Sequence, residues 1–277
     1  MEQKILCIIG RRQSGKTSLA SYLTGYEMRR NNRLKFFDVD EQGNLLVNTA
    51  AMDASGNEVE GTGILDITRK DFDFAKFAQH GIWPYCKLYN FADSLKQALM
   101  VIFGIEYEQL FGTNEQKNSL TKLKWEDMPG VYTNPIYSEK EINYFENNLK
   151  LQCKQPGYMT ARQVMQYFGT EVCRKMYDDC WADACYRDIQ LDGYPFNIIA
   201  DCRFPNEAVY MKSKGAKLLK LTKTPFKDDT HQSELVVDTI PLEMIDYVLD
   251  NENMTIKEKN EAALNKLMEW GWIGGTL

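Results

Sequence analysis

The clearest chemical signal in the sequence is a phosphate-binding loop near its start. The segment GRRQSGKT, residues 10–17, matches the pattern G-x-x-x-x-G-K-[ST] in full. Gly10 and Gly15 allow the backbone to turn tightly and to approach a polyphosphate without a clash from a Cβ atom. Consecutive backbone N–H groups then face phosphate oxygens, Lys16 reaches the β- and γ-phosphates, and Thr17 offers a hydroxyl to Mg²⁺. These residue types predict a site for a nucleoside triphosphate with magnesium.

A second set of chemically useful residues follows a later apolar run, Phe196–Ala200. Asp201 ends that run, and an aspartate at the carboxyl end of a parallel strand faces the ligand crevice. We therefore predict that Asp201 holds Mg²⁺ or its waters, with a simple helix cap as the alternative. Arg203 lies two residues later. Its planar guanidinium could bind a second phosphate through two hydrogen bonds, and a surface ion pair is the alternative.

Both segments need a framework of alternating strands and helices. Short apolar runs predict strands at 4–10, 85–91, 196–200 and 217–221. Helical patterns are expected at 94–103, 161–168, 171–189, 206–214 and 255–270. Strands that alternate with helices indicate β-α-β units. The fold class expected is therefore α/β, a P-loop fold whose parallel sheet is covered by helices on both faces.

We expect residues 1–277 to form one domain. Two regions of it depart from the alternation of strands and helices. Residues 34–65 contain short strand-like runs separated by turn residues, and we predict an inserted antiparallel hairpin or meander. Residues 111–158 are polar and contain three prolines. We interpret them as an excursion from the sheet, near the site of a second substrate, because long excursions in compact domains are often functional.

Composition limits the class of protein. The chain has 277 residues, of which 44% are hydrophobic and 26% charged, as in an ordinary globular protein. No apolar run reaches the roughly 18 residues of a bilayer-spanning helix, and the first residues lack the pattern of a secretory signal. The net charge of −6 argues against a basic surface for duplex nucleic acid. Seven cysteines without a C-x-x-C pair indicate reduced thiols in a cytoplasmic protein.

The phosphate loop alone does not distinguish a switch from a kinase. Residues 40–43 and 53–56 match the D-x-x-G pattern of GTP-binding switches, but both coincide with expected hairpin turns, where Asp and Gly serve the backbone. A kinase fits better, because it must bring two anionic substrates together and exclude water. The polar segment KTPFKDDTHQSE carries cations at Lys223, Lys227 and His231. We predict a lid at 223–235, with an ordinary solvated loop as the alternative.

Longer segments narrow the class further. The segments GRRQSGKT, YNFADSLKQALMVIFG, MTARQVMQYFGTEVCRKMYDDCWAD, IIADCRFPNEA and DDTHQSE occur in this order. In these segments the chain resembles the phage-type deoxynucleoside monophosphate kinases, a branch of the nucleoside monophosphate kinase-like P-loop fold. The resemblance implies that ATP with Mg²⁺ is the donor and that a deoxynucleoside monophosphate is the acceptor. It also suggests a homodimer, which the residues alone do not indicate.

The same resemblance assigns roles to individual residues. The implied ATP-binding residues are Gly10, Arg12, Ser14, Gly15, Lys16, Thr17, Ser18 and Lys223. The implied acceptor-binding residues are Asp93, Lys96, Arg162, Gln166, Gly169, Thr170, Arg203 and Glu207. Lys16, Asp201 and Arg203 are expected at the reacting phosphates, with Thr17 and Asp201 toward the metal. For Asp93 the alternative is a helix-start charge, and for Gln166 and Thr170 it is an ordinary polar position at a helix end.

Two other functions share the same loop. One is a P-loop kinase that acts on a modified base within DNA, against which the acidic net charge argues. The other is a regulator that binds a nucleotide without turnover. Neither the base of the acceptor nor a preference for a modified pyrimidine follows from the residues.

Overall fold

The computed structural model describes residues 3–52, 58–224 and 236–274. The chain divides into two compact units. Unit 1 comprises residues 1–93 and 181–277, and unit 2 comprises residues 94–180. The expected excursion at 111–158 lies inside unit 2, which also takes in the helices on either side of it.

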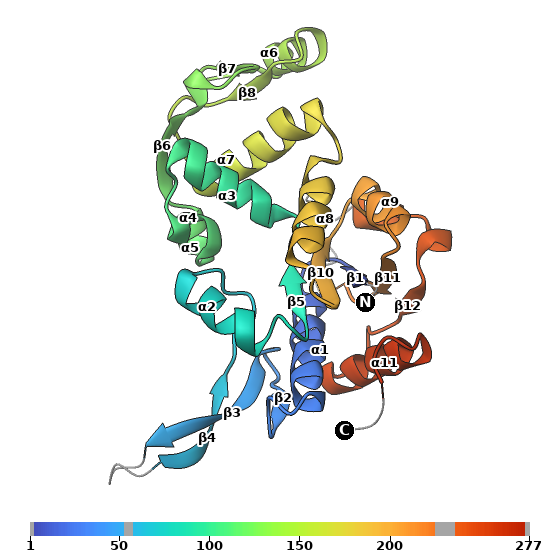
Figure 1. The fold of residues 1–277 in the computed structure, drawn as a ribbon. Helices are drawn as coiled ribbons and strands as arrows, with labels where there is room; N and C mark the ends of the chain where they lie inside the picture. Colours follow the sequence, from blue (N-terminus) through green and yellow to red (C-terminus); the bar gives the residue numbers. More distant parts are fainter. Residues whose placement is uncertain (1–2, 53–57, 225–235, 275–277) are drawn as a thin grey trace. The chain divides into compact units, whose positions relative to one another are not determined.

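Unit 1 is built on a five-stranded sheet in which every neighbouring pair is parallel (Figure 1). Its strands are β1 (Lys4–Ile9), β5 (Lys87–Tyr89), β10 (Phe196–Cys202), β11 (Lys217–Leu221) and β12 (Tyr247–Leu249). The order across the sheet is β12-β11-β1-β10-β5. The parallel α/β fold predicted from the sequence is confirmed, and β12 is a strand that the sequence analysis missed.

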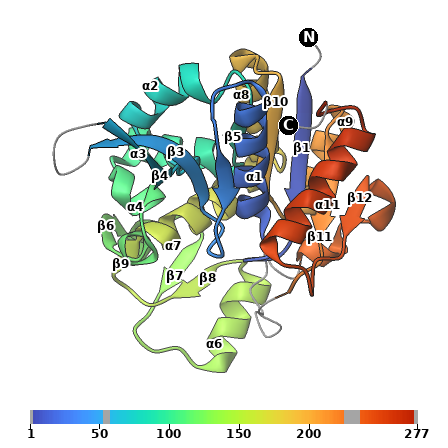
Figure 2. The ribbon, with the colours of Figure 1, turned by 90° about the horizontal axis from the view of Figure 1, so that it is seen from below.

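Alternate residues of β1 point into two separate cores. Leu6 and Ile8 join a cluster with residues of α1 (Lys16–Arg30), α2 (Phe72–Gly81) and α11 (Ile256–Glu269). Ile5, Cys7 and Ile9 join a second cluster with residues of α8 (Cys180–Asp192) and α9 (Pro205–Ser213). Burial of side chains on both faces of a strand explains why it reads as a continuous apolar run. Figure 2 shows α1 and α11 close together, and they pack against each other.

The inserted region after α1 is a three-stranded antiparallel sheet of order β2-β3-β4. Its strands are β2 (Phe37–Val39), β3 (Leu45–Met52) and β4 (Glu58–Ile64). Leu45 and Val47 are buried in the same core as α1, which anchors the sheet to unit 1. Asp40 shapes the β2–β3 turn by accepting hydrogen bonds from the backbone N–H groups of Gln42 and Asn44. The second D-x-x-G segment, 53–56, lies outside the described residues.

Unit 2 consists of short helices and strands. Its helices are most of α3 (Ala92–Phe103), α4 (Tyr107–Phe111), α5 (Asn114–Lys117), η1 (Trp125–Asp127), α6 (Glu139–Asn143), η2 (Tyr144–Asn148), α7 (Ala161–Gln166) and η3 (Tyr167–Arg174). Its strands are β6 (Leu120–Lys124), β7 (Val131–Thr133), β8 (Gln152–Lys154) and β9 (Tyr158–Thr160). β6 pairs with β9 antiparallel, and β7 pairs with β8 parallel. Leu99, Leu110, Met159 and Val164 are buried.

One predicted helix was wrong in its extent. The sequence pattern predicted a continuous helix over 171–189, but residues 177–179 are not helical and α8 begins only at Cys180. Asp178 and Asp179 stand just before the new helix. Aspartate is a weak former of helix interiors and a favourable charge at a helix start, so the pair marks a boundary that the apolar periodicity conceals.

Two short 3₁₀ helices, η4 (Val237–Thr239) and η5 (Leu242–Met244), precede β12. In residues 3–52, 58–224 and 236–274, no helix has both the length and the apolar character that a bilayer crossing requires.

Candidate functional site

The strand register brings the two sequence-predicted groups to the same edge of the sheet. β1 lies beside β10 in parallel, with Ile9 opposite Cys202. Gly10 and Arg203 therefore follow directly from paired positions, where the chain leaves the sheet on both strands. α1 packs on one face and α9 on the other, which opens a crevice beyond the carboxyl ends of these strands.

Two glycines of the loop are required by its close packing. A Cβ atom on Gly10 would lie 2.5 Å from Ser14 Oγ and 3.1 Å from the backbone oxygen of Leu221. Gly15 has φ 97°, in the left-handed region that favours glycine, and it caps the start of α1. The backbone of this loop can thus approach a ligand where larger residues would intrude.

Lys16 is buried and its ammonium folds back onto the loop. Its Nζ donates hydrogen bonds to the carbonyl oxygens of Gly10, at 2.7 Å, and Arg11, at 2.6 Å. Ser14 Oγ is also buried, and within the described part of the chain it has no hydrogen-bond partner. An unpaired buried hydroxyl in the phosphate loop fits a site whose oxygen-rich ligand supplies the missing acceptor.

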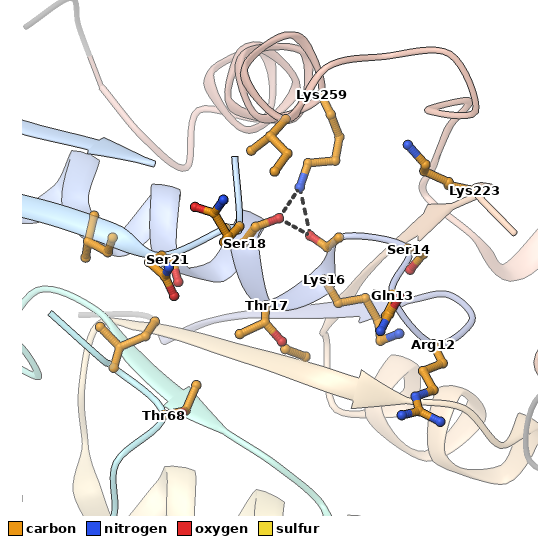
Figure 3. A pocket seen from close by; sticks show the side chains of 18 of the residues that line it. Arg12, Gln13, Ser14, Lys16, Thr17, Ser18, Ser21, Thr68, Lys223 and Lys259 are labelled. Carbon is orange, nitrogen blue, oxygen red and sulfur yellow. Dashed lines mark hydrogen bonds between the residues drawn. The ribbon is translucent and has the colours of Figure 1, made fainter. Parts of the chain in front are cut away.

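The loop opens into a pocket of about 1010 Å³ that lies within unit 1 (Figure 3). Its walls come from the phosphate loop, the β2–β3 turn, the segment after β4, the end of β10 and the C-terminal part of the chain. The lining residues include Arg12, Thr17, Ser18, Gly43, Thr68, Asp201, Arg203, Lys223, Asn251 and Lys259. The inserted sheet thus contributes a wall of the pocket, because a Cβ on Gly43 would lie only 2.9 Å from Ser18 Cβ.

The carboxylate of Asp201, near the end of β10, is held by the backbone at the start of α3. It accepts hydrogen bonds from the backbone N–H of Phe91 at 3.0 Å and of Ala92 at 3.4 Å. Burial, and then the negative charges of Glu207 and Asp93, raise the pKa of Asp201 to about 7, although the two N–H groups act in the opposite direction. A strongly perturbed carboxyl group in a pocket is typical of a functional site.

The start of α9 is capped by Glu207 rather than by Asp201. Glu207 is buried, and its Oε2 accepts hydrogen bonds from the backbone N–H groups of Arg203, at 3.0 Å, and Phe204, at 3.1 Å. This contact fixes the backbone from which the Arg203 side chain enters the pocket. A direct contact between Glu207 and an acceptor stays a prediction.

The donors in the pocket fit a magnesium ion that arrives with a nucleotide. Thr17 is exposed at the start of α1, and Asp201 lines the same pocket. Over the described ranges, no three His, Cys, Asp or Glu side chains gather into a metal-binding group. Mg²⁺ is commonly held by one or two carboxylates together with waters and substrate phosphates, which suits so sparse a protein contribution.

Two pocket residues were missed because they come from the far end of the chain. Asn251 follows β12; its Nδ2 donates to the carbonyl oxygen of Ser14 at 2.9 Å, and its Oδ1 accepts from the backbone N–H of Lys223 at 3.0 Å. Lys259 of α11 donates from Nζ to the carbonyl oxygen of Gly15 and to Ser18 Oγ. No local pattern marks either residue, since each depends on contacts more than two hundred positions away.

The other predicted residues are distributed over both units. In unit 1, Asp93 is paired with Lys70 at 2.8 Å, and Lys223 lines the pocket. Residues 225–235 of the predicted lid, with Lys227 and His231, lie outside the described residues. In unit 2, Lys96 Nζ lies 4.5 Å from the ring centre of Phe111.

Arg162 is another predicted acceptor-binding residue of unit 2. It donates hydrogen bonds to the side chains of Asn114, at 2.9 Å, and Asn118, at 3.0 Å. Gln166 and Thr170 are exposed, whereas Gly169 is buried in η3. Their roles toward an acceptor stay predictions.

A parallel sheet with a phosphate loop after its first strand, and an Asp and Arg at the adjoining strand end, are the features of a nucleotide-binding protein of the P-loop class. The family model described as "Deoxynucleotide monophosphate kinase" matches residues 4–260. A protein of Acanthamoeba polyphaga mimivirus named "Putative deoxynucleotide monophosphate kinase" is 29% identical over 182 residues, covering 61% of this chain and 76% of that relative. The chain belongs to the deoxynucleotide monophosphate kinase family.

Proposed function

We propose that this protein transfers the γ-phosphate of ATP to a deoxynucleoside monophosphate, giving ADP and a deoxynucleoside diphosphate. The observation that supports this most is the opposition of Ile9 and Cys202, because it sets the phosphate loop beside Arg203 at one strand edge. A kinase needs such a pair of anion sites, one for the donor and one for the acceptor.

The donor end of the proposed reaction is the phosphate loop. The backbone N–H groups of residues 10–18 and the start of α1 receive the phosphates of ATP, together with the side chains of Arg12, Ser14 and Ser18. Lys16 exchanges its two loop carbonyls for phosphate oxygens. Lys223, which lines the same pocket, adds a further positive charge.

The acceptor phosphate is proposed to bind Arg203. Its guanidinium neutralises the phosphate that attacks, and Glu207 holds the backbone of Arg203 in place. Thr17 and Asp201 would hold Mg²⁺, and the ion would neutralise charge on the transferred phosphoryl group. Positioning and charge stabilisation are the whole contribution of the protein, since phosphoryl transfer requires little covalent chemistry from it.

Further acceptor-binding roles, implied by the sequence resemblance, are proposed for residues of each unit by itself. They are Lys96, Arg162, Gln166, Gly169 and Thr170 in unit 2, and Asp93 in unit 1. Arg162 already makes two hydrogen bonds to neutral amide oxygens, which leaves its positive charge uncompensated by those partners. A side chain held in this way is suited to orient a polar base or sugar.

The experiment is an assay of ADP release with Mg²⁺, ATP and a panel of deoxynucleoside monophosphates, with product identified by chromatography. We expect ADP and the matching deoxynucleoside diphosphate in equal amounts. Transfer to DNA that contains modified bases, but not to the free mononucleotides, would favour the DNA kinase instead. Tight ATP binding with no product from any acceptor would favour a regulator.

A further inference from the structure

Lys259 is a buried cation to which the proposed reaction gives no role. It lies on α11 and is 2% exposed. Its Nζ lies 2.8 Å from the carbonyl oxygen of Gly15 and 2.7 Å from Ser18 Oγ (Figure 3). Both partners belong to the phosphate loop and the first turn of α1, so the ammonium group lies against the loop proposed to bind the triphosphate.

The loop does not need Lys259 to satisfy its own hydrogen bonds. The carbonyl oxygen of Gly15 also accepts from the backbone N–H of Leu19 at 3.0 Å and from Ser18 Oγ at 3.0 Å. Removal of the ammonium group would therefore leave no buried acceptor without a donor at Gly15. A purely structural reason for a lysine at this position is correspondingly weak.

The charge of Lys259 is poorly placed unless an anion is bound. The start of α1 carries the positive end of the helix dipole, which repels a cation. Within the part of the chain that the structure describes, no carboxylate forms an ion pair with Lys259. Burial, followed by the nearby charge of Lys223, lowers the pKa of Lys259 to about 7. The site thus gathers positive charge from Lys16, Lys223, Lys259 and the helix start.

We propose that Lys259 is a positioning residue for the nucleoside triphosphate: it holds the start of α1 in place and presents a charge that the bound polyphosphate compensates. The inference rests on the proposed use of ATP as donor. Its action passes through Gly15 and Ser18, so Lys259 supports the loop without taking part in the transfer. Binding of the polyphosphate favours the charged form of Lys259 and therefore draws a proton from solution above pH 7.

The test compares Lys259→Met and Lys259→Gln with the control Lys257→Met, an exposed lysine on the same helix. Met preserves length without charge, and Gln retains a hydrogen-bond donor without charge. We expect the Kd for ATP to rise about tenfold or more in both Lys259 variants, as loss of a charge-assisted contact implies. The KM for the acceptor and the kcat at saturating ATP should change much less, and the control should match the wild type.

A second measurement separates charge from packing. Calorimetry of ATP binding at pH 8, in two buffers with different enthalpies of ionisation, reports the protons taken up. We expect the wild type and Lys257→Met to take up more protons than Lys259→Met, because only they carry the lysine that regains its proton. The variant subtracts any contribution from Lys16, Lys223 and Asp201, which it retains.

Two results would overturn the proposed role of Lys259. One is wild-type ATP affinity in both Lys259 variants, and the other is equal proton uptake in Lys259→Met and the wild type. A loss of ATP affinity that only parallels a lower melting temperature, and equally weakens the acceptor, would also overturn it. A wild-type protein that binds no ATP would instead overturn the proposed function.

Discussion

The side-chain amide of Asn251 donates a 2.9 Å hydrogen bond to the carbonyl oxygen of Ser14, although 237 positions separate the two residues. The same amide group accepts a hydrogen bond from the backbone of Lys223. One buried side chain thus joins the phosphate loop to the residues that follow β11. The geometry of the loop is set in part by the C-terminal edge of the sheet.

Asn251→Ala should lower both stability and ATP affinity. It leaves the carbonyl oxygen of Ser14 and the N–H of Lys223 without this partner, at a cost of about 1–3 kcal/mol in the free energy of unfolding. The measurement is denaturant unfolding together with ATP titration, with the exposed Asn253→Ala as the matched control. Equal stability of the two variants would show that the bridge contributes nothing.

Arg203→Lys keeps the positive charge but loses the planar fork. We expect kcat/KM for the deoxynucleoside monophosphate to fall about tenfold or more, while the KM for ATP changes little. Steady-state kinetics with each substrate varied in turn measures this. Arg187→Lys is the control, because Arg187 is exposed on α8 and pairs with Asp183. Weaker ATP binding with an unchanged acceptor would reverse the assignment of the two anion sites.

Lys259→Met should have a stability advantage that depends on pH. The folded protein holds the pKa of Lys259 at about 7, below its ordinary value of 10.5 in the unfolded chain. Between these values the unfolded chain binds the extra proton, so the stability of the wild type increases as pH rises through this range. The variant lacks this increase.

Without nucleotide, the melting temperature of Lys259→Met should therefore exceed that of the wild type by the largest amount at about pH 6–7, where the buried lysine is charged. The difference should shrink as pH rises toward 9. Lys257→Met, whose lysine is exposed, should differ from the wild type by the same amount at every pH. A constant difference for Lys259→Met would contradict the buried, perturbed lysine.

Features encoded in short segments could be predicted from the sequence. The phosphate loop needs two glycines, a lysine and a threonine at fixed spacing, and β1 before it is an uninterrupted apolar run. Asp201 and Arg203 could be placed at a strand end because β10 is equally apolar. The pairing of Ile9 with Cys202, in contrast, is known only from the structure.

Features that depend on distant partners could not be predicted. β12 has only three residues, of which one is buried, so its apolar pattern is too short to recognise. Asn251 and Lys259 look like ordinary surface residues until the C-terminal segment packs behind the phosphate loop. The break at 177–179 was hidden because apolar periodicity continues on both sides of Asp178 and Asp179.

Lys16 provides the most direct test of the central claim, phosphoryl transfer from ATP bound at the phosphate loop. The measurement is formation of deoxynucleoside diphosphate from Mg²⁺, ATP and the best monophosphate of the panel, by wild type, Lys16→Ala and the control Lys257→Met. We predict product from the wild type and the control, and a rate lower by about 100-fold or more in Lys16→Ala, with an unchanged circular dichroism spectrum. A natively folded Lys16→Ala protein that turns over at nearly the wild-type rate would contradict the account.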